Sequence, residues 1–333
     1  MSESGPRKKM SVVVPVYFNE ASLPHLFTKL QWLEAELATL SLDLELIFVD
    51  DGSLDGSWKA LLDIRGARPA TKLIKLSRNF GAVAASNTGF QFVTGDCFMV
   101  LSADLQDPVE QLLLMVRHWL DGRKFVISVR KERVDPLMTR LFAATFYVIV
   151  RNLVLESYPK GGFDLMLMDR ALLPHLAGSS AHTNPNMLAY WLGFEPTVLE
   201  YKREERRFGK SRWTFRKKLK FFLDTVTGFS TAPIRLVSWL GVAVAMLSFV
   251  YGVWIAINAA LGRIEAQGFA TLAVLVSFFS GLILMSLGIV GEYLWRIFDL
   301  VNHKPKSVID VTLLAPDGQS SPAAQLEGST SSG

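Results

Sequence analysis

Acidic side chains follow apolar runs in the first third of the chain. Asp50 and Asp51 come directly after the run at 44–49, and Asp104 comes shortly after the run at 97–101. Carboxylates that face a phosphate-bearing ligand repel it unless a divalent cation lies between them. Hard oxygen ligands of this kind suit magnesium or manganese. The pattern therefore predicts a site where a divalent cation helps to bind an anionic ligand.

The apolar runs alternate with segments of helical spacing. Strands are expected at residues 11–16, 44–49, 72–76 and 97–101, and helices at 23–40, 58–64 and 81–93. Predominantly apolar strands that alternate with helices indicate an α/β fold with a parallel sheet covered on both faces. Ligands of such sheets bind at the carboxyl ends of the strands. The loops at 17–20, 50–53, 78–81 and 102–107 are therefore the expected site.

Two common phosphate-binding devices are missing from these loops. No Gly-x-Gly-x-x-Gly follows an expected strand, and no Gly-x-x-x-x-Gly-Lys-Ser/Thr occurs. Asp50, Asp51 and Asp104 are better explained as functional residues than as caps. For Asp55 and Asp107, a turn or helix-cap role is favoured, since Pro108 marks a helix start directly after Asp107.

Two long uncharged stretches lie near the C-terminus, at 236–262 and 266–291. Each exceeds the roughly 20 apolar residues that cross a bilayer. Only three residues separate them, so they form a hairpin whose outer ends lie on one side. Basic residues flank both ends, which predicts a cytoplasmic head and tail in an integral protein of the inner membrane. Two buried helices of a large soluble protein are the alternative, but core helices rarely run past 25 residues without a charge.

Composition agrees with one head of about 230 residues plus this hairpin. The chain has 333 residues and a net charge of +4, and its basic residues crowd 202–220, just before the first apolar stretch. That placement suits anionic lipid or an anionic substrate better than nucleic acid. Cys97 is the only cysteine, which excludes an internal disulfide and fits a reducing compartment. No cleavable signal peptide is expected in the first residues.

Several motifs together resemble the family 2 glycosyltransferases of the GT-A fold. They lie at 14–20, 49–53, 78–81, 103–108, 162–166, 206–213 and 228–235, and the resemblance runs from about residue 10 to 305. More narrowly, the chain is similar to the polyprenyl-phosphate glycosyltransferases, which include dolichyl-phosphate mannose synthases and bactoprenol-phosphate glucosyltransferases. The resemblance implies inverting, metal-dependent transfer of a sugar from a nucleotide-sugar, with a UDP-sugar favoured, to undecaprenyl or another polyprenyl phosphate.

The resemblance also implies roles for individual residues. Donor binding falls to Pro15, Tyr17, Asn19, Glu20, Asp50, Asp51, Ser53, Asn79, Gly81, Ser102 and Ala103. Asp104 and Gln106 are expected to bind Mg²⁺ or Mn²⁺. The residues expected to act in catalysis are Asp104, Arg130, Asp164, Arg206 and Arg212, and the acceptor phosphate is assigned to Arg130 and Arg140. Guanidinium groups suit phosphate because they bind it bidentately and stay charged.

Two departures from the family pattern affect these roles. Ser102 stands where many relatives have the first carboxylate of Asp-x-Asp, so the metal site has one acid fewer. Phe18 lengthens the first loop, which leaves open whether Asn19 or Glu20 faces the base.

The expected organisation has five parts. Residues 1–9 are a flexible N-terminus, 10–214 a GT-A catalytic domain, 215–235 an interfacial amphipathic helix, 236–295 two transmembrane helices, and 296–333 a cytoplasmic tail, disordered from about 314. A second interfacial segment is considered at 137–155. The expected partners are a nucleotide-sugar donor, a polyprenyl phosphate acceptor and the bilayer, without nucleic acid, in a homo-oligomer.

Three alternatives stay open. A processive polysaccharide synthase shares the same head, but such enzymes typically carry Gln-x-x-Arg-Trp, and Gly209 stands at the glutamine position here. A non-enzymatic membrane scaffold with a decayed transferase head is motivated by Ser102. A soluble transferase with a protein or sugar acceptor is disfavoured by the hairpin.

Overall fold

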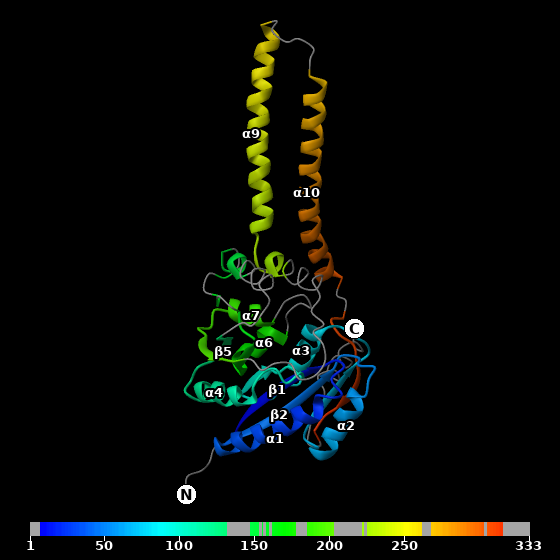
Figure 1. Cartoon of the computed structure of the whole chain (residues 1–333), viewed down its shortest axis with the longest axis vertical. Coiled ribbons are helices and arrows are strands. Elements are labelled where there is room, and N and C mark those ends of the chain that lie inside the picture. The colour runs from blue at the N-terminus through cyan, green and yellow to red at the C-terminus, as the bar shows by residue number, and fades with distance from the viewer. Residues whose placement is uncertain are drawn as a thin grey trace, which may run out of the picture. The chain divides into compact units, whose positions relative to one another are not determined.

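The computed structural model describes residues 7–131, 147–152, 155, 158–159, 162–177, 185–202, 222, 225–261, 268–302 and 305–315. The chain divides into two compact units, coloured along the sequence in Figure 1. The first comprises residues 1–148, 157–214 and 305–333, and the second comprises 149–156 and 215–304. The expected interfacial segments at 137–155 and 215–229 fall largely outside the described residues, so these predictions stay open.

The first unit is built on an eight-stranded sheet of order β7-β5-β6-β4-β1-β2-β3-β8. Its strands are β1 (Lys8–Val16), β2 (Leu42–Asp50), β3 (Lys72–Leu76), β4 (Cys97–Val100), β5 (Phe125–Arg130), β6 (Leu165–Asp169), β7 (Thr197–Tyr201) and β8 (Ile309–Leu313). Strands β1 to β4 are mutually parallel, as expected from their apolar sequences.

Two strands, β6 and β8, are antiparallel to the other strands of the sheet. β6 pairs antiparallel with both β4 and β5, β7 pairs parallel with β5, and β8 pairs antiparallel with β3. The carboxyl ends of β1 to β5 and β7 therefore share one edge with the amino end of β6. This edge receives side chains from loops that are far apart in the sequence.

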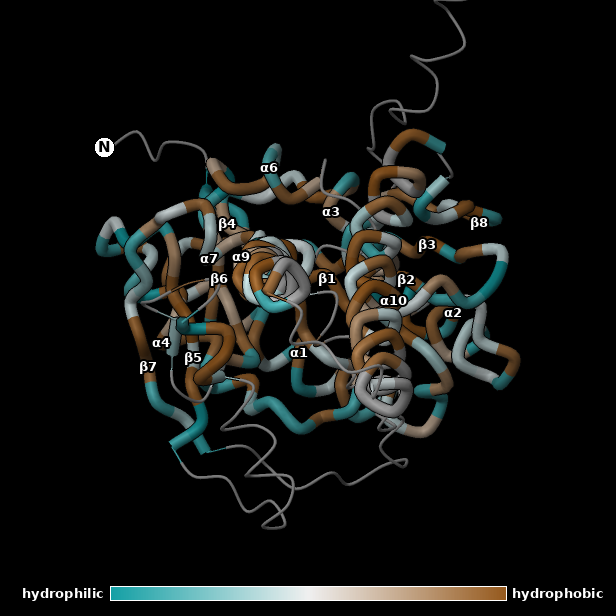
Figure 2. Tube along the Cα trace, turned by 90° about the horizontal axis from the view of Figure 1, so that it is seen from above, coloured by the Kyte–Doolittle hydropathy of each residue, from teal (hydrophilic) through white to brown (hydrophobic). Residues whose placement is uncertain are grey.

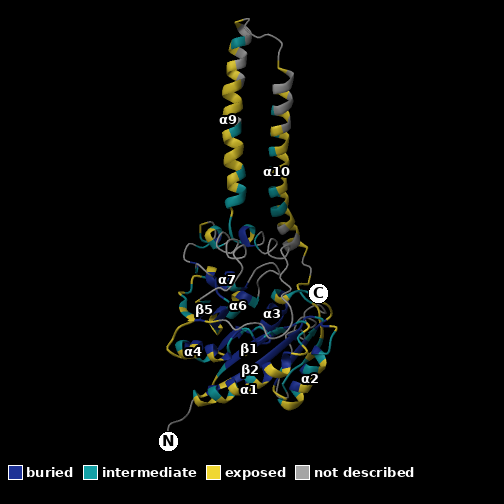
Figure 3. Ribbon diagram, in the orientation of Figure 1, coloured by how far each residue is buried: buried dark blue, intermediate teal, exposed yellow. Residues whose placement is uncertain are grey.

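Helices cover both faces of this sheet. They are α1 (Leu23–Thr39), α2 (Ser57–Ala67), α3 (Ala82–Phe90), α4 (Val109–Leu120), α6 (Leu173–Ala177) and α7 (Pro185–Trp191), with a 3₁₀ turn at Arg170–Leu172. The apolar face of α1 repeats at helical spacing and joins Val12 and Val14 in one core. Gly89 of α3 instead lies against Val13 and Val49, whose side chains point to the opposite face. Figure 3 shows the resulting buried strands.

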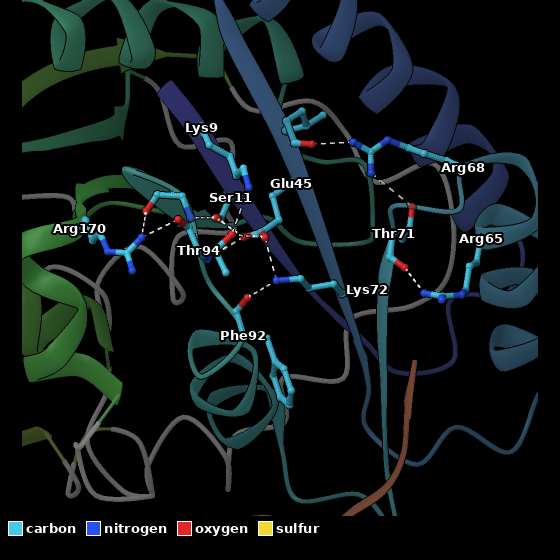
Figure 4. Close-up of polar contacts among 12 residues, drawn as sticks. Lys9, Ser11, Glu45, Arg65, Arg68, Thr71, Lys72, Phe92, Thr94 and Arg170 are labelled. Atoms are coloured by element: carbon cyan, nitrogen blue, oxygen red, sulfur yellow. Dashed lines mark hydrogen bonds and ion pairs between the residues drawn. The ribbon is translucent and has the colours of Figure 1, made fainter. Parts of the chain in front are cut away.

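A polar network is buried near the amino ends of the strands. Glu45 of β2 pairs with Lys72 at the start of β3, with Oε1 and Nζ 2.8 Å apart. Ser11 Oγ donates to Glu45 Oε2 at 2.5 Å, and Thr94 donates through both its backbone N and its hydroxyl, at 2.8 and 2.6 Å. Figure 4 shows these side chains pointing toward one another. Burial raises the pKa of Glu45, but hydrogen bonds from Lys72, Ser11 and Thr94 outweigh it and lower the pKa.

The strand β8 lies in the expected tail at 296–333, ahead of the part expected to be disordered from about 314. Hydrogen bonds from the rest of the first unit hold the chain at both ends of this strand: Ser77 N donates to Val308 O at 2.9 Å, and Arg65 donates to Leu313 O and Leu314 O at 3.0 and 2.5 Å. The segment after the second apolar helix thus completes the sheet. Its short, partly polar sequence gave no clear strand pattern.

The second unit contains the two expected long helices, α9 (Ala232–Ala260) and α10 (Phe269–Val301). Both are long and apolar enough to cross a membrane, by length and composition alone. Figure 2 shows hydrophobic residues along both helices. α10 continues to Val301, beyond the uncharged stretch expected at 266–291.

Candidate functional site

The loop after β1 is tied to the loop after β2 by hydrogen bonds. Phe18, at φ 56°, donates its backbone N–H to Ser53 Oγ at 3.1 Å, and Asn19 N donates to Ser57 Oγ at 2.8 Å. The Glu20 carboxylate accepts from Gly56 N at 3.0 Å. The φ of 56° places Phe18 in the left-handed region of backbone conformations. This conformation is strained for an aromatic residue, and strain of this kind is common in functional loops.

Asp50 is the last residue of β2 and Asp51 follows it, and both side chains are buried. Asp50 Oδ1 accepts from Ser53 N at 3.2 Å, whereas its Oδ2 is buried and has no hydrogen-bond partner within the described residues. Burial raises the pKa of Asp50, and the hydrogen bonds from Ser53 offset this only in part. A buried acceptor without a partner is costly in a native structure. Its presence at the predicted edge indicates a place for a ligand donor group.

Asp51 organises the loop between β3 and α3. Its carboxylate accepts from Asn79 Nδ2 at 2.9 Å, Phe80 N at 2.7 Å and Gly81 N at 2.9 Å. Burial raises the pKa of Asp51, and the backbone donors at Phe80 and Gly81 offset this only in part. Gly52, at φ +66°, allows the close approach, because a Cβ there would lie 2.5 Å from the Arg78 carbonyl carbon. Thus Asp51, Asn79 and Gly81 lie together, as predicted.

The loop after β4 carries the predicted metal residues. Asp104 Oδ1 accepts from Gln106 N at 3.3 Å, and Leu105 between them has φ 60°. Within the described part of the chain, no group of three or more His, Cys, Asp or Glu side chains is arranged to hold an ion by itself. Asp104 and Gln106 offer hard oxygen ligands, which fit Mg²⁺ or Mn²⁺ when substrate phosphates supply further oxygens.

A second cluster forms at the same edge, from residues that the sequence does not place together. Arg130, the last residue of β5, binds Asp164 with two side-chain hydrogen bonds, one of them Nη2 to Oδ1 at 2.7 Å. Tyr201, the last residue of β7, directs its hydroxyl to Asp164 Oδ2 and to Asp107 Oδ1, both at 3.1 Å. Burial lowers the pKa of Arg130, but hydrogen bonding and the charge of Asp164 outweigh it and raise the pKa. The guanidinium therefore stays charged.

The interpretation of Asp107 as a helix cap is wrong. Pro108 occupies the N-cap of α4, with no side-chain cap hydrogen bond, while Asp107 is buried against Tyr201. Asp55 fits its expected turn role, because its carboxylate accepts from Ser57 N at 3.2 Å at the start of α2.

A cavity of about 210 Å³ lies at this edge of the sheet. It brings together Pro15, Ser102 and Asp164, all of them predicted site residues. Its lining also contains Ser86, Asp107 and Asn186, which sequence reasoning missed as site residues. Only Asp107 carried a signal, its place after an apolar strand; Ser86 lies inside a helix and Asn186 far downstream.

Three predicted arginines lie outside the described residues: Arg140, Arg206 and Arg212. Their roles stay predictions. Tyr17, Asn19, Glu20, Asp50, Asp51, Ser53, Asn79, Gly81, Ala103, Asp104 and Gln106 are described in the loops at the carboxyl edge, although none of them lines the cavity.

Comparison with known proteins agrees with the geometry. The family model for glycosyl transferase family 2 matches residues 11–180. The chain is 32% identical over 299 residues to an uncharacterised glycosyltransferase of Synechocystis, covering 89% of this chain and 93% of that one. It is 30% identical over 304 residues to a bactoprenol glucosyl transferase of Shigella phage SfV, covering 90% of this chain and 98% of that one.

Among solved structures, a mannosyltransferase of Pyrobaculum calidifontis in complex with GDP-Man and Mn²⁺ is similar over 86% of this chain and 90% of that one, with a TM-score of 0.43 and 17% identity. The family match and the identity to curated relatives confirm the resemblance drawn from the motifs. The chain therefore belongs to glycosyl transferase family 2 and is a glycosyltransferase with the GT-A fold.

Proposed function

We propose that this glycosyltransferase moves a sugar from a nucleotide-sugar, with a UDP-sugar favoured, to a polyprenyl phosphate at the cytoplasmic face of the membrane. The observation that carries the proposal is the 30% identity to a bactoprenol glucosyl transferase across 90% of this chain. An alignment of that extent cannot leave out both α9 and α10, which comprise 29 and 33 residues. Helices of this kind would hold the transferase at the bilayer in which a lipid acceptor is dissolved.

The proposed organisation follows from this acceptor. Residues 10–214 would form the catalytic domain, 215–235 an interfacial helix and 236–295 two spans, with both termini cytoplasmic. Protease treatment of sealed inside-out vesicles tests the topology, because it should then remove a tag at residue 333. Protection of that tag would contradict the proposed orientation.

The buried acids of the first unit would hold the donor. Asp50 Oδ2, which lacks a hydrogen-bond partner within the described residues, would accept from the base or ribose. Asp51 would act indirectly, because its oxygens already hold the loop at Asn79–Gly81. Tyr17 and Glu20 would complete this half of the site.

Asp104 and Gln106 would hold Mg²⁺ or Mn²⁺ together with the donor diphosphate. When bound, the cation would offset negative charge on the leaving nucleoside diphosphate. Arg130 would bind the acceptor phosphate through N–H groups other than the two that contact Asp164. Asp164 would orient this guanidinium rather than take a proton, since a phosphate monoester is already largely ionised at neutral pH.

The reaction would be a single displacement. A phosphate oxygen of the lipid attacks the anomeric carbon as the bond to the nucleoside diphosphate breaks, which inverts the anomeric configuration. Positioning two anions and stabilising the departing charge would account for most of the rate enhancement.

The test uses the purified full chain in detergent, a short polyprenyl phosphate, Mg²⁺ or Mn²⁺, and a panel of radiolabelled nucleotide-sugars. Label should enter the lipid fraction with one donor. Asp104→Ala should abolish this transfer, whereas Asp63→Ala, at an exposed position of α2, should preserve it. Absence of labelled lipid with every donor would refute the proposed function, and full transfer by Asp104→Ala would refute the metal assignment.

A further inference from the structure

One phenol lies between two carboxylates in the cavity region. The Tyr201 hydroxyl is 3.1 Å from Asp107 Oδ1 and 3.1 Å from Asp164 Oδ2. A phenol has a single proton, so it donates to only one of these carboxylates at a time. Tyr201 and Asp107 are 5% and 6% exposed, so bulk solvent does little to screen the contact between these two groups, while the Asp164 side chain is 27% exposed.

The backbone fixes the position of this phenol. Tyr201 ends β7 and stands in register with Arg130 at the end of β5, and Lys131 N donates to Tyr201 O at 3.0 Å. Asp164 directly precedes β6 and donates its backbone N–H to Ser128 O of β5 at 3.3 Å. Three neighbouring strands thus set the distance between the hydroxyl and the Asp164 carboxylate.

The two carboxylates belong to different parts of the site. Asp107 closes the loop that carries Asp104 and Gln106, the proposed metal residues. Asp164 is the partner of Arg130, the proposed acceptor-phosphate residue. The hydroxyl therefore links the donor loop to the acceptor pair, and both carboxylates line the same cavity.

We propose that Tyr201 is a positioning residue for the transfer reaction, which shares its hydroxyl proton between Asp107 and Asp164 and so fixes the acceptor pair relative to the donor loop. The inference rests on the proposed function. When Arg130 engages an incoming phosphate through its remaining N–H groups, its attraction for Asp164 weakens, because one positive charge is then shared between two anions. The phenol then donates to Asp164 and keeps that carboxylate in place.

The test is Tyr201→Phe in the full chain, which removes the hydroxyl and keeps the ring. Loss of a hydrogen bond to a charged group corresponds to a fall in kcat of about 10- to 100-fold. The donor KM should change by less than about threefold, since the phenol acts after both substrates are bound. The double variant Asp107→Asn/Tyr201→Phe should have a kcat only slightly below that of the more impaired single variant. Both changes disrupt the same hydrogen bond, so their effects should not add.

The matched control is Tyr190→Phe, which removes a hydroxyl from another buried tyrosine of the first unit. It should leave kcat unchanged. An unchanged kcat in Tyr201→Phe, a fall shared equally by Tyr190→Phe, or additive losses in the double variant would overturn the positioning role. An inactive wild-type chain would refute the proposed function and this inference with it, so the two failures are distinguishable.

Discussion

The buried pair of Glu45 and Lys72 offers a sharp test of what stabilises the sheet. Lys72→Met keeps most of the side-chain volume but removes the ammonium that lies 2.8 Å from the Glu45 carboxylate. The side chains of Lys72 and Glu45 are only 12% and 7% exposed, so solvent cannot replace the lost partner. The carboxylate is then left with its donors at Ser11 and Thr94 alone.

The magnitude follows from this geometry. Breaking a buried ion pair by removing one partner costs about 3–5 kcal/mol. We expect about 3 kcal/mol for Lys72→Met, at the lower end, because three donors to Glu45 remain. A typical domain has a free energy of unfolding of about 5–15 kcal/mol, so the loss is large. The double variant Glu45→Gln/Lys72→Met should lose less, since no buried charge is left unpaired.

The single cysteine provides the assay. Cys97 is buried in β4, and burial raises the pKa of its thiol, so a maleimide dye should label it only after the sheet opens. Urea titrations of the full chain in detergent, followed by labelling, then report the stability of the first unit. Lys59→Met, at an exposed position of α2, is the matched control.

Two results would refute this reasoning. One is a decrease of less than about 1 kcal/mol in the free energy of unfolding of Lys72→Met, which is the range measured for exposed ion pairs. The other is a double variant as unstable as the sum of both single changes, which would mean that the two groups do not interact. Because the network lies at the amino ends of the strands, away from the proposed site, kcat at a permissive temperature should stay unchanged.

Further expectations concern the same network, the C-terminal strand and the donor loop. The folded pKa of Glu45 is lowered, so the wild-type advantage over Glu45→Gln in urea unfolding should be full above about pH 4.3, the unfolded value. It should shrink as the pH falls through the folded pKa, and a constant difference down to low pH would contradict this. Arg65→Met should speed hydrogen exchange of β8 about tenfold relative to β1, since it removes donors to the Leu313 and Leu314 carbonyls; equal exchange would contradict the anchoring role. Asp51→Asn should raise the donor KM about tenfold or more by displacing the loop at 79–81, and an unchanged KM would contradict it.

Much of the fold could be predicted because the strands and helices of the N-terminal part follow from short-range patterns in the sequence. The apolar runs at 11–16, 44–49, 72–76 and 97–101 became β1 to β4, and the alternation with helices predicted their parallel order. The two uncharged stretches became α9 and α10, since length and composition suffice for such helices. In contrast, β8 pairs with β3 across more than 200 residues, and its short partly polar sequence carries no periodic signal.

The candidate site likewise contains some residues that the sequence could predict and others that it could not. Asp50, Asp51 and Asp104 could be found because each follows a strand whose apolar sequence identifies it. Asp107 was missed as a site residue because its contact with Tyr201 depends on a strand that no pattern predicted.

The amino-acid sequence alone determined the α/β class, the two long apolar helices and the acids at the strand ends, because hydrophobic periodicity and turn residues act over short distances. Only the tertiary structure decided that β6 runs against β4 and β5, which brings Asp164 to the edge where Arg130 and Tyr201 end their strands. Strand order across a sheet depends on long-range pairing and packing, for which neighbouring residues carry little information.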